Sequence, residues 1–144
     1  MIHRLVILLT LLVSAPVGAE MPTIQIKIAN HALSTEVANT QQSRMQGLMH
    51  RQSMDQDRGM LFVFPENGYH SMWMVNTNIP LSVAFIDEKG MILNIADMVP
   101  HTRMAHGSAG LAKYAIETNL GWFWGRGIKA GKYVTGLGRV PAAE

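Results

Sequence analysis

Hydrophobic and polar residues alternate along this chain in short runs, a pattern typical of β-strands that are buried on one face. The alternation covers residues 24–28 and, after a turn at 30–32, residues 33–37. Two such runs around a short turn predict a β-hairpin at the start of the domain.

Further apolar runs lie between clusters of turn residues and predict a meander of strands. The expected strands cover residues 60–64, 69–75, 81–87, 91–99, 114–118 and 132–135, with turns at 66–68, 76–78 and 88–90 and an irregular loop at 100–110. This pattern predicts a single α+β domain that is mostly β, built from antiparallel strands.

Two short helical segments complete the prediction. Thr40 can cap a helix from Gln41 to about Met49, which has one apolar face with i, i+3, i+4 spacing. A helical turn is expected around Trp122–Trp124. Three consecutive aromatic side chains cannot all face the core, so at least one of them should be exposed.

The first residues have the order of a secretory signal peptide. A histidine and an arginine precede an apolar run, Leu5–Val13, and small residues follow up to Ala19. A membrane span needs about 20 apolar residues, roughly twice this run, so cleavage before Glu20 is expected. The predicted organisation is a signal peptide at 1–19, one domain at 20–135 and a flexible C-terminal tail at 136–144. We expect a periplasmic or extracellular protein with no stable membrane insertion after cleavage.

Composition narrows the classes of function. The 144 residues are 48% hydrophobic and 15% charged, with a formal net charge of +2. These values describe one globular domain, and the chain has no basic run of the kind that binds nucleic acid. There are 11 methionines and no cysteine. Without cysteine the chain has no disulfide, thiol nucleophile or thiolate metal site, so core burial alone must hold the fold.

Three motifs stand in order along the chain and resemble a known family. They are Gly47-Leu48-Met49-His50-Arg51, Gly59-Met60-Leu61-Phe62-Val63-Phe64-Pro65, and Trp73-Met74-Val75-Asn76-Thr77-Asn78-Ile79-Pro80-Leu81. Together they resemble the bacterial and archaeal family catalogued as domain of unknown function, family 192, also called uncharacterised protein family 0127. The resemblance extends from about Ile24 to Val134. It implies a mostly β domain that curls toward a barrel, often behind a signal peptide, and it implies no agreed activity.

The chain departs from the pattern of that family at three positions. Val75 stands where a lysine is usual, Ser82 where an aspartate is usual, and Met72 where an aromatic residue is usual. A mechanism that needs the lysine and the aspartate as a pair is therefore not expected in this chain.

Glu117 is the most informative ionisable residue, because it follows apolar residues in a predicted strand and buried carboxylates need a partner. Arg51 is the favoured partner, with Arg44 second and Lys113 third. The alternative is a carboxylate that faces a ligand in a groove, as a general acid or base. A hydrolase of that kind would need a second carboxylate, such as Asp87 or Asp97.

A second hypothesis concerns copper. In a strand of period 2, His70, Met72 and Met74 would all point to one face. An imidazole and two thioethers could hold Cu(I), a soft ion. The alternative is that the methionines fill the core, which they do readily because they are unbranched and flexible.

The remaining unexplained polar and aromatic residues predict a binding surface, because strand ends and loops carry binding in β domains. Its candidate ligand-binding residues are Arg51, Trp73, Asn76, Thr77, Glu117 and Trp122. Every nucleophile and acid–base pattern in the chain is incomplete, so we interpret the domain as a non-catalytic extracytoplasmic binding or accessory module. Its partner would be a small ligand, a glycan or an envelope protein. The alternatives are a periplasmic Cu(I)-binding protein and a hydrolase that uses Glu117 with an aspartate.

Overall fold

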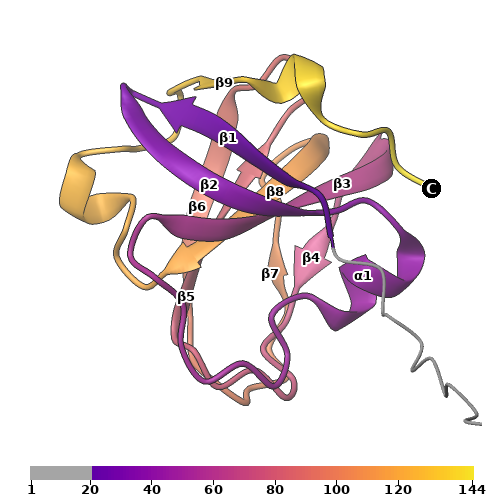
Figure 1. The fold of residues 1–144 in the computed structure, drawn as a ribbon, viewed down its shortest axis with the longest axis vertical. Coiled ribbons are helices and arrows are strands. Elements are labelled where there is room, and N and C mark those ends of the chain that lie inside the picture. Colours follow the sequence, from indigo (N-terminus) through magenta and orange to yellow (C-terminus); the bar gives the residue numbers. More distant parts are fainter. Residues whose placement is uncertain (1–20) are drawn as a thin grey trace, which may run out of the picture.

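The computed structural model describes residues 21–144, so the predicted signal peptide and its cleavage site lie outside the described residues. Strands make up most of the regular structure, as predicted (Figure 1). In chain order the elements are β1 (Thr23–Ile28), β2 (His31–Ala38), α1 (Gln41–Gln46), β3 (Arg58–Gly68), β4 (Ser71–Met72), β5 (Leu81–Ile86), β6 (Ile92–Met98), β7 (His106–Gly107), β8 (Ala112–Asn119), the 3₁₀ turn η1 (Trp124–Arg126), β9 (Val134–Thr135) and η2 (Leu137–Arg139).

One curled sheet forms the body of the domain. Its seven strands lie in the order β6-β5-β8-β3-β2-β1-β9, and β4 and β7 form a separate antiparallel pair. All pairings in the large sheet are antiparallel except β2 with β3, which are joined through α1 and run parallel. In Figure 1 the strands β1 and β2 cross over the others, so the sheet curls into half a barrel. The predicted fold class is confirmed.

The hairpin of β1 and β2 follows from the alternation in the sequence. Its turn lies at Ala29 and Asn30, which have φ angles of 47° and 68°, slightly earlier than the expected turn at 30–32. Two consecutive residues with positive φ give the tight turn whose twist matches that of the flanking strands.

The helix α1 is shorter than predicted, because it ends at Gln46 rather than near Met49. Thr40 caps it as expected, in a capping box with Ser43. Gly47 follows with φ 47°, and a Cβ there would lie 3.3 Å from the ring of Phe62. The glycine therefore lets the chain turn where the helix ends. Met45, which was expected on a buried helix face, lies within α1 and is 70% exposed.

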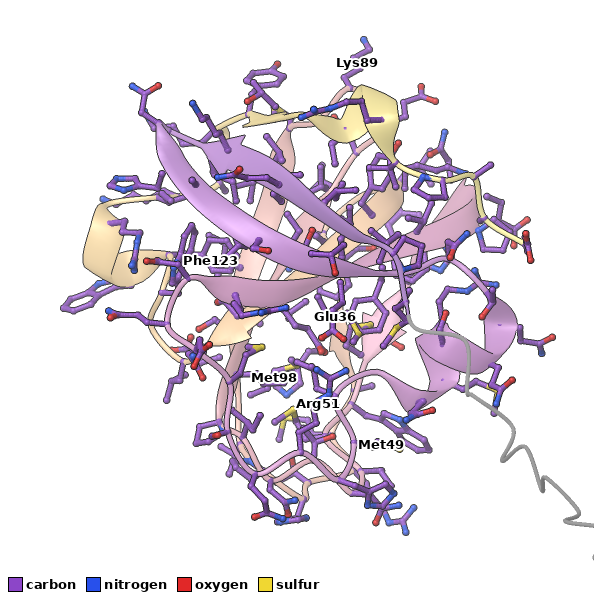
Figure 2. The ribbon with its side chains drawn as sticks, in the orientation of Figure 1. Glu36, Met49, Arg51, Lys89, Met98 and Phe123 are labelled. Atoms are coloured by element: carbon purple, nitrogen blue, oxygen red, sulfur yellow. The ribbon has the colours of Figure 1, made fainter. Side chains whose placement is uncertain are left out.

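Both faces of the sheet are covered by apolar side chains. One face, the first core cluster, is built around Ile26, Ile28, Leu33, Val37, Leu61, Ile116, Trp122 and Phe123. The opposite face, the methionine-rich cluster, includes Leu48, Phe62, Phe85 and the buried Met60, Met74 and Met98, with Met21, Met54 and Met72 packed against it. Figure 2 shows yellow sulfur atoms around the labelled Met98. This second cluster adjoins the candidate site.

Other predicted boundaries also differ from the structure. The strand at 60–64 continues through the expected turn at 66–68 to Gly68, with a register shift after Val63. The strand expected at 69–75 is reduced to the two residues of β4. Residues 136–144, expected as a flexible tail, pack Leu137, Val140 and Ala143 against the first core cluster. No helix among residues 21–144 is long and apolar enough to cross a membrane.

Candidate functional site

Glu117 lies near the end of β8 on the face of the methionine-rich cluster. It stands opposite Met60 of β3 and Val83 of β5, so apolar side chains flank it on both sides. The residue is 4% exposed. Among residues 21–144 its carboxyl group has no hydrogen-bond or ion-pair partner.

The environment of Glu117 favours its neutral form. Burial raises the pKa of this carboxyl group from 4.5 to about 8, because it removes the hydration that stabilises the charged form. At neutral pH the group therefore carries a proton, and it can donate as well as accept a hydrogen bond.

A cavity of about 210 Å³ opens beside Glu117. It lies between α1 with the residues after it, β3, and the segment from β4 to Thr77. We call it the Glu117 pocket. Its lining residues are Arg44, Met45, Gln46, Gly47, Leu48, Met49, Phe62, Ser71, Met72, Trp73, Thr77 and Glu117. Since no side-chain oxygen in the described part of the chain is both sealed from solvent and unbonded, the carboxyl group must open into this pocket.

The predicted ion pair between Arg51 and Glu117 is wrong. Arg51 pairs instead with Glu36 through both of its terminal nitrogens, one of them at 3.0 Å. Glu36, Met60 and Glu117 stand side by side across β2, β3 and β8. Neighbouring strands lie about 4.8 Å apart, so the two glutamates are roughly 10 Å apart and Met60 separates them.

The other two candidate partners of Glu117 are also engaged elsewhere. Arg44 lines the pocket, but its guanidinium group donates to the carbonyl oxygens of Asn39 at 2.8 Å, Val63 at 3.1 Å and Glu144 at 2.8 Å. The Nζ atom of Lys113 donates to the carbonyl oxygen of Pro65 at 3.1 Å. The pocket therefore holds a carboxyl group without a cation from the described chain.

The pair of Arg51 and Glu36 has a positioning role. Figure 2 shows the two labelled residues in the middle of the view. The backbone oxygen of Arg51 accepts a hydrogen bond from the side chain of Asn78 at 3.2 Å. The pair thus ties the loop after α1 to β2, and Asn78 ties that loop to the segment that carries Trp73 and Thr77.

The predicted binding surface comes together only in part. Trp73, which is 51% exposed, and the buried Thr77 line the Glu117 pocket with Glu117 itself. Trp122 does not, because it lies in the first core cluster on the opposite face of the sheet. The expectation that Trp122 converges with Trp73 and Glu117 is therefore wrong. The exposed aromatic of that turn is Trp124, at 86%.

Asn76 has a local structural role. It has φ 53°, in the left-handed region, and its carbonyl oxygen accepts a hydrogen bond from the backbone N–H of His50 at 2.9 Å. Asparagine tolerates this conformation better than most residues other than glycine. Asn76 is not among the residues that line the Glu117 pocket.

We therefore expect Asn76→Ala to lower the free energy of unfolding by about 1–2 kcal/mol, since alanine is strained at positive φ. Asn76→Gly should lose less than Asn76→Ala, because glycine adopts this conformation freely. Urea unfolding of the two variants measures the difference. Equal losses in both would mean that the asparagine side chain, and not the backbone conformation, matters at this position.

The three residues of the copper hypothesis do not share one strand face. The strand ends at Met72, Met74 is fully buried in the methionine-rich cluster, and the ring of His70 stacks on Phe64 at 3.9 Å. The Nε2 atom of His70 lies 3.0 Å from the carbonyl oxygen of Glu66. The period-2 argument is thus wrong for this segment, while Cu(I) binding itself stays a prediction.

Neither aspartate of the hydrolase hypothesis reaches the pocket. Asp87 accepts hydrogen bonds from two backbone N–H groups of its own turn, both at 2.9 Å. Asp97 accepts a hydrogen bond from Ser82 Oγ at 2.9 Å, and this pair projects from the face opposite Glu117. Ser82 Oγ also accepts the N–H of Gly121 at 2.9 Å, so the serine found in place of the family's aspartate has a structural role. Glu117 is the one carboxylate among the described residues that line the pocket.

The sequence prediction missed the pocket residues Met45, Met49 and Phe62, which it assigned to a helix face and a buried strand. Gly47 was the available signal, since a glycine inside a predicted helix often marks its end. An end at that point places Leu48 and Met49 on a loop beside Phe62.

The profile of the DUF192 family, described as uncharacterised, matches residues 24–136. The chain belongs to the DUF192 family. The resemblance inferred from the three sequence motifs is therefore confirmed, and the Glu117 pocket is a feature of this DUF192 protein that the family description does not explain.

Two crystal structures are similar to this DUF192 protein. One, from Sinorhizobium meliloti and described as a proposed transcription regulator, is 34% identical with a TM-score of 0.80, and the match covers 84% of this chain and 98% of that chain. The other, a protein of unknown function from Novosphingobium aromaticivorans, is 29% identical with a TM-score of 0.77 and covers 83% of this chain and 89% of that chain. The search of curated proteins gives no match.

Proposed function

We propose that this DUF192 protein is an exported, non-catalytic binding module, and that it takes a small ligand in the Glu117 pocket. The observation that supports this most strongly is the carboxyl group of Glu117, which is 4% exposed, lacks a partner among residues 21–144 and lines a cavity of about 210 Å³. A buried polar group without a partner is costly, so its retention beside a cavity favours a role in recognition.

The rest of the lining fits a binding site. Most small-molecule sites are mainly apolar, with a few polar groups that orient the ligand. Phe62, Leu48 and the methionines supply the apolar wall, and Glu117 and Thr77 supply buried polar atoms. Among residues 21–144, Glu117 is the one carboxylate that lines the pocket, which favours binding over two-carboxylate hydrolysis.

Export is the other part of the proposal, and it rests on the order of residues 1–19. The Sinorhizobium protein is described as a proposed transcription regulator. The proposed function differs from that description, because this sequence has no basic run for phosphate contacts.

A fragment screen by ligand-observed NMR tests the pocket. Fragments that bind the wild type should bind Glu117→Gln several-fold more weakly, since the amide cannot reproduce the hydrogen bond of the carboxylic acid and such a bond contributes about 0.5–1.5 kcal/mol. Glu66→Gln is the matched control, because Glu66 is exposed and does not line the pocket. The proposal would be overturned if no fragment binds, or if the fragments bind Glu117→Gln as tightly as they bind the wild type.

A further inference from the structure

The Glu117 pocket combines features that select for positive charge. Its one carboxyl group lacks a cation within residues 21–144, and the basic residues predicted as partners are bound elsewhere. A buried carboxylate is stabilised when a cation is brought against it. A ligand that enters the pocket can therefore supply the cation that residues 21–144 do not provide.

The walls of the pocket also suit a cation that carries an apolar body. The aromatic rings of Trp73 and Phe62 border the cavity. Aromatic faces attract ammonium groups through their quadrupole, with tryptophan the strongest. Met45, Met49 and Met72 add thioethers, which are polarisable and adapt their shape to an apolar group.

The size of the cavity limits the ligand. Its volume of about 210 Å³ equals roughly that of seven water molecules at about 30 Å³ each. The cavity can therefore hold a small organic molecule and is larger than a single metal ion requires. The mouth is marked by exposed side chains, among them Met45, Ser71 and Trp73, so the pocket is open to ligands from solvent.

We infer that the Glu117 pocket binds a small organic ammonium compound, with its charged nitrogen against the Glu117 carboxylate and its apolar body between Trp73 and the methionine side chains. This inference rests on the proposed function and names its class of ligand.

Binding of such a cation should be coupled to loss of the Glu117 proton. The charged groups around Glu117 are few: α1 contributes Arg44, and β2 contributes Glu36, which is paired with Arg51 beyond Met60. The neighbours from β3 and β5 are Met60 and Val83, and β4 contributes Met72, none of which titrates. Glu117 is thus the group that exchanges the proton.

The test uses 2-phenylethylamine and its neutral counterpart 2-phenylethanol as probes. Calorimetry at pH 7 should show the amine binding at least tenfold more tightly than the alcohol. The heat should also change with the ionisation enthalpy of the buffer, because close to one proton is released per amine bound. Glu117→Gln should abolish both the preference and the proton release.

Two further variants distinguish the pocket from other surfaces. Trp73→Ala should weaken amine binding about tenfold, whereas Trp124→Ala should leave it unchanged, because Trp124 does not line the pocket.

Other outcomes would overturn the inference in identifiable ways. Equal binding of the alcohol and the amine through Glu117 would refute the ammonium class and leave the proposed function standing. Binding of Cu(I) that depends on Met45 and Met72, without any response to the amine, would replace the organic cation by a metal ion. An absence of binding by both probes, together with an empty fragment screen, would refute the proposed function as well.

Discussion

Replacing Glu117 with glutamine should make the protein more stable at pH 8 and should change its stability little at pH 4.5. Burial raises the pKa of this carboxyl group from 4.5 to about 8 in the folded protein. Between these two pH values the folded state keeps the proton while the unfolded state has lost it. Folding then takes up a proton, so the free energy of unfolding of the wild type falls as the pH rises.

The size of the effect follows from the width of this pH interval. Each pKa unit corresponds to about 1.4 kcal/mol. A pKa raised from 4.5 to about 8 therefore lowers the free energy of unfolding of the wild type by an amount on the order of 5 kcal/mol at alkaline pH. Glutamine has a similar shape and no charge, so the variant lacks this pH dependence.

Urea unfolding of both proteins at pH 5, 6.5 and 8 measures the difference. The stability of Glu117→Gln minus that of the wild type should increase steadily across the series. Glu66→Gln, whose side chain is exposed, should follow the wild type at every pH. A constant difference between Glu117→Gln and the wild type would contradict the prediction, because it would show that Glu117 is already ionised in the folded protein across this pH range.

This prediction also bears on function. If glutamine both stabilises the fold and removes binding, then the carboxyl group is retained at a cost in stability. Such a trade-off is typical of residues that serve a site, because a residue kept only for stability would not destabilise the fold when ionised.

The sequence predicted most of the sheet because β1 and β2 bury alternate residues, whereas β3 and β5 are apolar runs buried on both faces. The strands β1, β2, β5, β6 and β8 all fall at or near the predicted ranges. The segment at 69–75 has similar composition but does not form a long strand, since the chain leaves the large sheet after Gly68 and buries Met74 from a loop after β4. Local pattern does not distinguish a buried loop residue from a buried strand residue.

The candidate site could likewise be predicted only in part from the sequence. Glu117 stood out in the sequence as a carboxylate within an apolar strand, and the structure confirms its burial. The partner of Arg51 could not be inferred, because Glu36 and Glu117 lie in the same row of side chains only through the parallel pairing of β2 with β3. That pairing depends on the whole fold, so no local signal shows which glutamate Arg51 contacts.

Trp122→Ala should lower the free energy of unfolding by about 3–5 kcal/mol, the usual cost of truncating a large buried aromatic residue. Trp122 is 3% exposed and packs edge to face with Phe123 at 5.3 Å. Its Nε1 atom donates to Asp57 at 3.1 Å, and Arg126 lies over its ring at 4.3 Å. The substitution would remove all of these contacts and leave a cavity in the first core cluster.

Trp124→Ala provides the matched control within the same turn. Trp124 is 86% exposed, so its truncation should change the free energy of unfolding by no more than about 0.5 kcal/mol. Trp122→Phe should lose less than Trp122→Ala, because it keeps most of the packing and removes the hydrogen bond to Asp57. Chemical denaturation of the three variants gives the comparison. Similar small losses for both alanine variants would return Trp122 to the candidate binding residues, whereas a loss confined to Trp122 leaves ligand recognition to the opposite face of the sheet, where Glu117 lies.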